Sequence, residues 1–131
     1  MCRSARCPDP CGTLNAVAGL LEQFAIAHPG GVTRRGGETF VEAELVVLLV
    51  DEAQRRGIAI LGLEGFLIDD ESVYPSLSHV ADFSGAEPEE AWAAARALLA
   101  GPWSSPPAPD DQINSSARGR YMLAVVLADD V

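Results

Sequence analysis

Residues 57–85, GIAILGLEGFLIDDESVYPSLSHVADFSG, hold the clearest strand pattern in the chain. From 58 to 68 nearly every position is apolar, so a strand here would carry apolar side chains on both faces. That pattern predicts an interior strand of a sheet rather than a solvated edge. The polar run DDES at 69–72 predicts a turn, and the chain then returns as a short antiparallel strand, Val73-Tyr74, which Pro75 ends.

Glu64 is the charged residue inside this apolar strand, and Gly62 and Gly65 flank it. The glycines leave room for a close approach of another group, or they mark a bulge. Because an unpaired buried carboxylate is costly, we expect Glu64 to reach an arginine or backbone donors, or to lie near a sheet end or a pocket. A structural and a functional role for Glu64 both stay open.

Helical patterns precede this stretch. Apolar residues at helical spacing predict a first helix over 13–28, and the glycine-rich segment 29–38 predicts a loop. The sequence TFVE at 39–42 fits a capping box for a second helix over 40–56. Its apolar middle, LVVLLV at 45–50, would also suit a strand. As a helix, it would have to be buried on most sides.

The C-terminal half predicts a short strand over 79–83 and a third helix that opens at Glu87-Pro88. A Pro- and Ser-rich loop follows at about 102–119, and a final apolar strand covers 120–128. We expect this last strand to pair with the strand at 58–68 in the centre of the sheet. The order of elements predicts an α+β fold, with a small, largely antiparallel sheet packed against about three helices.

The length and the charge of the chain limit what it can be. Its 131 residues are enough for a single domain, which we place at 13–131 after a flexible N-terminal tail at 1–12. The net charge is −10, so we expect no nucleic-acid binding, because neutralising phosphates needs a basic surface. No apolar run reaches membrane-spanning length, and the N-terminus does not read as a secretory signal. We therefore expect a cytoplasmic protein with no membrane partner.

The sequence carries no motif that indicates catalysis. It has neither a nucleophile elbow nor a phosphate-binding loop, and its two histidines, His28 and His79, are far apart. Cys2, Cys7 and Cys11 have a spacing that matches no metal or cluster pattern. We therefore expect a protein that is not an enzyme and that holds no metal or cofactor, and the role of the cysteines stays open.

Acidic residues gather between Gly57 and Gly101, where the chain has eight carboxylates and a single base, Arg96. Such a surface serves either solubility alone or the steering of the chain onto a basic protein partner. The residues predicted to contact such a partner are Asp69, Asp70, Glu71, Asp82 and Glu87.

The stretch 57–84, with a helical pattern before and after it, resembles small bacterial immunity proteins of polymorphic toxin systems. The residues that carry the resemblance are Gly57, Gly62, Glu64, Gly65, Phe66, Asp82 and Phe83. The resemblance implies a short, acidic, cytoplasmic α+β protein that binds and blocks a cognate toxin, often a nuclease. The alternatives are a small ligand-binding domain or enzyme with Glu64 in a pocket, and a non-catalytic subunit of a larger assembly.

Overall fold

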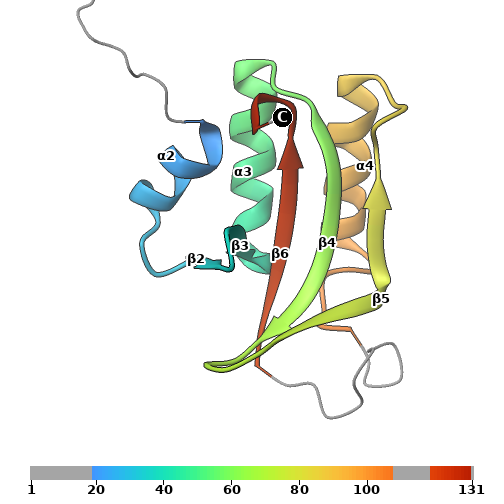
Figure 1. Cartoon of the computed structure of the whole chain (residues 1–131). Helices are drawn as coiled ribbons and strands as arrows, with labels where there is room; N and C mark the ends of the chain where they lie inside the picture. The colour runs from blue at the N-terminus through green and yellow to red at the C-terminus, as the bar shows by residue number, and fades with distance from the viewer. Residues whose placement is uncertain (1–18, 108–118, 131) are drawn as a thin grey trace, which may run out of the picture.

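The computed structural model describes residues 19–107 and 119–130. Within them, five strands form one antiparallel sheet in the order β2-β3-β6-β4-β5, and helices pack against it (Figure 1). The strands are β2 Val32–Arg35, β3 Glu38–Glu42, β4 Ile60–Ile68, β5 Val73–Asp82 and β6 Arg120–Leu127. The helices are α2 Leu20–Ala27, α3 Ala43–Arg56, α4 Pro88–Ala100 and the short 3-10 helix η2 Ala128–Asp130. The predicted α+β fold is confirmed.

Several expectations from the sequence concern residues outside the described ranges. These are the flexible tail at 1–12 with its three cysteines, the beginning of the first helix at 13–18, and most of the loop at 102–119. The described part of the first helix, α2, begins at Leu20 and ends at Ala27, one residue before His28.

β4 and β6 lie side by side at the centre of the sheet, as the sequence predicts (Figure 1). Leu63 of β4 lies opposite Val125 of β6, and Phe66 lies opposite Met122. β3 pairs with the other side of β6, and β5 pairs with the other side of β4. Both central strands are therefore interior, which is why each is apolar on both faces.

α3 and α4 lie behind the sheet in Figure 1 and cover one of its faces. The residues of α3 at helical spacing that are fully buried are Val46, Leu49, Val50 and Ala53. This confirms a helix rather than a strand at 45–50. The expectation that the helix is buried on most sides is wrong, because Val47 is 38% exposed and Leu48 is 45% exposed.

The main hydrophobic core fills the space between these two helices and the sheet. Leu63 of β4 and Leu123 and Leu127 of β6 point into it and are almost fully buried. Trp92 of α4 also lies in this core, and its indole Nε1 donates a hydrogen bond of 3.0 Å to the carbonyl of Ile58. The opposite face of the sheet therefore turns away from both long helices.

The segment predicted as a loop at 29–38 is in part a hairpin. β2 and β3 pair from Val32 opposite Val41 to Arg35 opposite Glu38, and Gly36 and Gly37 both have positive φ at the tight turn. The predicted capping box is also wrong, because β3 continues to Glu42 and α3 begins only at Ala43. Pairing of β3 with the long strand β6 outweighs the local helical signal.

β5 corrects another prediction, because the strand does not end at Pro75 but continues to Asp82. A proline is tolerated here since β5 is an edge strand, where a missing backbone N–H need not break a ladder bond. The register jumps from Pro75 opposite Phe66 to Val80 opposite Glu64. The chain between them bulges, and the hydroxyl of Ser76 accepts hydrogen bonds of 3.2 Å from the backbone N–H groups of Ser78 and His79.

Candidate functional site

The predicted contact residues lie at two opposite ends of β5. Asp69, Asp70 and Glu71 form the turn before the strand, whereas Asp82 is its last residue and Glu87 follows it. The stretch of β4 that pairs with β5 between these ends covers about 20 Å at the usual rise of a strand. The five residues therefore do not form one compact site.

At the first end, Asp69 holds the turn together. Its carboxylate oxygen Oδ1 accepts hydrogen bonds from the backbone N–H groups of Glu71, at 2.9 Å, and Ser72, at 2.7 Å. The guanidinium of Arg35 donates to the carbonyl oxygen of Asp69. Asp69 thus has a structural role in the turn, while Asp70 and Glu71 are exposed to solvent.

At the other end, carboxylates gather where β5 leads into α4. Asp82 accepts a hydrogen bond of 2.9 Å from the backbone N–H of Ser84. This bond, together with one from the Ser84 side chain, holds the pKa of Asp82 below its usual value of 3.8. Glu87 caps α4, and its backbone N–H donates to the carboxylate of Glu90. We call Asp82, Glu87, Glu89 and Glu90, all of them exposed, the β5–α4 acidic cluster.

Glu64 lies on the sheet face that the long helices leave uncovered. It stands opposite Val80 of β5 and Ala124 of β6, and the next row of the same face contains Asp82, Gly62 and Val126. Residues opposite one another in a sheet share a face, and so do residues two positions apart along a strand. Among the described residues, the half-buried Glu64 carboxylate forms no ion pair and no side-chain hydrogen bond.

Two valines beside Glu64 leave much of their surface open to solvent. Val80 is 57% exposed and Val126 is 45% exposed. Together with Glu64 and Asp82 they form what we call the open patch. Protein-binding surfaces combine apolar and polar side chains in this way.

The rest of the same face is closed by a second, smaller core. It contains the buried residues Phe40, Phe66, Ile68, Met122 and Ala124. The rings of Phe40 and Phe66 meet edge to face with their centroids 4.9 Å apart. Since Phe40 comes from β3, the β2–β3 hairpin completes this core. The open patch is therefore confined to the end of the sheet that carries the β5–α4 acidic cluster.

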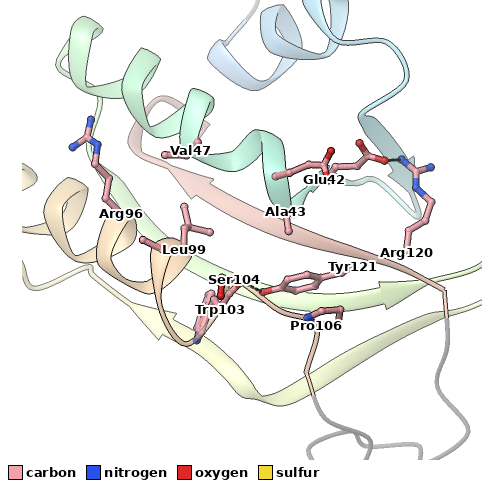
Figure 2. Close-up of a pocket in the computed structure, with 12 residues that line it drawn as sticks. Glu42, Ala43, Val47, Arg96, Leu99, Trp103, Ser104, Pro106, Arg120 and Tyr121 are labelled. Atoms are coloured by element: carbon pink, nitrogen blue, oxygen red, sulfur yellow. Dashed lines mark hydrogen bonds and ion pairs between the residues drawn. The ribbon is translucent and has the colours of Figure 1, made fainter.

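A groove lies elsewhere, between the start of α3, the end of α4 and the start of β6 (Figure 2). Its volume is about 700 Å³. Trp103 and Tyr121 form its aromatic wall, and the Tyr121 hydroxyl donates a hydrogen bond of 2.8 Å to the Trp103 carbonyl. Burial raises the pKa of Tyr121 to about 12. Glu64 is not among the lining residues.

Both arginines of this groove have acidic partners. Arg120 is paired with Glu42 at the mouth of the groove, as Figure 2 shows, and Arg96 is paired with Asp51 at 2.8 Å. Trp103 is buried and its ring stacks on His79 with the centroids 5.0 Å apart. This groove was not predicted from the sequence, because the Pro- and Ser-rich composition after 102 indicates a long loop. A tryptophan within a Pro- and Ser-rich segment was the available signal that this part packs against the domain.

Within the described ranges, no three His, Cys, Asp or Glu side chains are grouped in a way that could hold a metal ion. The cysteines lie outside these ranges. No helix in the described part of the chain is both long enough and apolar enough to cross a membrane.

Comparison with known proteins yields no match to a family model, to a curated protein or to a solved structure.

Proposed function

We propose that this chain is a non-enzymatic, cytoplasmic immunity-type protein that binds a basic bacterial toxin domain and neutralises it. The observation that carries this proposal is the position of the open patch directly beside the β5–α4 acidic cluster. Val80 and Val126 offer apolar surface, and Asp82 belongs to both groups. A partner with an apolar centre and a basic rim could contact the valines and the carboxylates at the same end of the sheet.

The mechanism follows from charge and from steric exclusion. The carboxylates of the β5–α4 acidic cluster would attract a basic surface at long range and then occupy it. If the toxin is a nuclease, these carboxylates would take the place of the substrate phosphates in its cleft. Asp70 and Glu71, at the far end of β5, would contribute to the long-range field and less to the contact itself.

The test begins with the tagged full chain in its native host. We expect it to retain a basic polypeptide whose toxic activity the purified chain abolishes at a one-to-one ratio, with an affinity that falls as salt is raised. Replacing Glu87, Glu89 and Glu90 together with glutamine should weaken the complex more than the control replacement of Asp70 and Glu71 with their amides. Recovery of metabolic enzymes alone, or of a partner whose activity is unchanged, would refute the proposal.

A second candidate rests on the groove of Figure 2. Its aromatic wall, together with arginines that already have acidic partners, favours a neutral, largely apolar small molecule. Mass spectrometry of the freshly purified chain under non-denaturing conditions separates the two candidates. A co-purified small molecule, lost when Trp103 is replaced by alanine, would favour the ligand-binding domain over the immunity protein.

A further inference from the structure

We propose that Glu64 is the docking point for an arginine side chain of the partner protein, inserted between Val80 and Val126 on the open patch. This inference rests on the proposed function insofar as the partner is a basic protein. It goes further, because it assigns the central contact to a residue outside the predicted set of contacts and names the group that Glu64 binds.

The carboxylate of Glu64 lies among apolar groups. Val80 and Ala124 lie opposite it on the two neighbouring strands, and Gly62 and Val126 occupy the adjacent row. A half-buried carboxylate loses part of its hydration and regains that free energy only from a donor or a cation. No described residue supplies one. Arg35 of β2 lies on the same face, but its guanidinium donates to the carbonyl oxygen of Asp69 and forms no ion pair with Glu64.

The shape and the charge of the open patch favour an arginine as the occupant. Its guanidinium is planar and donates two parallel hydrogen bonds to a carboxylate. Its aliphatic stem would lie along the exposed methyl groups of Val80 and Val126 and remove them from water. Asp82, in the same row as Gly62, adds a second negative charge.

A second copy of this chain fits the open patch less well. The net charge of −10 makes two copies repel each other, and the patch itself contains two carboxylates, Glu64 and Asp82. A face-to-face dimer through this surface would bring these carboxylates together without a counter-charge. A basic partner removes that repulsion, which is why we assign the surface to a different protein.

The experiment uses a defined probe, so it does not depend on knowing the toxin. The isotope-labelled full chain is titrated with the peptide acetyl-Gly-Leu-Arg-Leu-Gly-amide and followed by the amide signals in nuclear magnetic resonance. A matched peptide carries citrulline, the neutral isostere of arginine, at the central position. We expect the arginine peptide to shift the amides at 62–64, 80–82 and 124–126, and the citrulline peptide to bind at least about tenfold more weakly.

Two variants locate the charge that the peptide recognises. Glu64→Gln should weaken binding of the arginine peptide at least about tenfold, since a charged hydrogen-bonded pair is lost. Glu71→Gln, which removes an exposed carboxylate at the far end of β5, should change the affinity less than about twofold. Val80→Ser, at an exposed position, should fold normally and weaken binding through lost apolar contact.

The outcomes separate this inference from the proposed function. Shifts confined to the turn at 69–72 or to the start of α4, or equal binding by the Glu64→Gln variant and the unmodified chain, overturn the inference. If a toxin is recovered and neutralised equally well by the Glu64→Gln variant, the immunity function stands and the docking point falls. If the peptide binds at Glu64 but no toxin is found, the docking point stands and the immunity function falls.

Discussion

The two faces of the central strands have similar apolar sequences but very different surroundings. On β6, Leu123 points into the main core and is fully buried, while Val126, three positions later, points to the other face and is 45% exposed. On β4, Leu63 is almost fully buried, and Glu64 beside it faces the uncovered side. An apolar strand pattern thus indicates an interior strand of a sheet. Packing of the helices and of the β2–β3 hairpin determines which of its apolar side chains are buried.

We expect the two faces of the sheet to have different roles, one in stability and one in binding. The helix-covered face contributes most of the stability, because burial of apolar surface is the main favourable term in folding. In the open patch, valine side chains remain in contact with water. Their exposed surface adds nothing to the stability of the fold. We therefore expect substitutions on the first face to change stability and substitutions on the second to change binding.

The largest expected effect comes from truncating a residue on the covered face. Leu123→Ala should lower the free energy of unfolding by about 2–5 kcal/mol, because it leaves a cavity in the main core. The matched change on the other face of the same strand, Val126→Ala, should cost less than about 1 kcal/mol. Urea unfolding at neutral pH measures both. Equal losses would remove the distinction between the faces.

Two glycines of β4 give a second pair. A methyl group added to Gly65 would lie 2.7 Å from the Cβ of the buried His79, so Gly65→Ala should cost about 1–3 kcal/mol through overpacking. A methyl group on Gly62, on the open patch side, would lie 3.2 Å from the Ala81 carbonyl, and a smaller shift relieves that contact. Thermal unfolding of the two variants should show Gly65→Ala as the less stable one, and the reverse order would contradict the packing described for β4.

Tyr121 should make the covered face sensitive to alkali. Burial raises its pKa to about 12, above the usual value of 10.0, so the fold favours the neutral phenol. That contribution to stability is complete below pH 10, and it is lost as the pH rises towards 12. Tyr121→Phe should cost about 1 kcal/mol at neutral pH, through the lost hydrogen bond to Trp103.

The measurement is the unfolding midpoint of the Tyr121→Phe variant and of the unmodified chain across the alkaline range. The difference between the two should shrink or change sign above pH 10, since the variant has no buried phenol to ionise. Tyr74 is present in both chains and serves as the internal control. Parallel alkaline curves would show that Tyr121 is not protected by burial.

The smallest expected effect concerns the open patch at acid pH. The bonds from Ser84 lower the pKa of Asp82, so its contribution to stability is present above its usual pKa of 3.8 and is lost as the pH falls through the lower, folded value. Asp82→Asn should therefore slightly reduce the loss of stability at acid pH. Because the residue is exposed, the stability of the variant near pH 7 should be almost unchanged. Acid titration followed by circular dichroism provides the comparison. A larger effect than that of Gly65→Ala would be inconsistent with an exposed position.

Much of the fold could be predicted from local pattern. The strands β4 and β6, their pairing, the polar turn at 69–72 and the proline-initiated α4 all follow from apolar runs and end signals in the sequence. The β2–β3 hairpin and the passage of β5 through Pro75 could not be predicted in this way. Both depend on neighbours distant in sequence: β6 holds β3 in place, and the edge position of β5 makes a proline acceptable.

Less of the candidate site than of the fold could be predicted from the sequence. The sequence shows each acidic residue, but their separation by the length of β5 is a property of the fold. Glu64 was recognised as unusual, yet whether it faces the core or the open patch depends on which face the helices cover. A tryptophan within a Pro- and Ser-rich segment indicates that this part packs against the domain, but its contact with Tyr121, 18 positions away, is a property of the fold.

The central claim is that Glu64 serves binding and not the fold, and one variant tests it through two readouts. Glu64→Gln removes the charge and keeps the shape of the side chain. The free energy of unfolding in urea should stay the same or rise, because the variant removes a half-buried charge that has no described partner. The affinity for the arginine peptide should fall at least about tenfold. A loss of more than about 1 kcal/mol in stability with unchanged peptide affinity would contradict it.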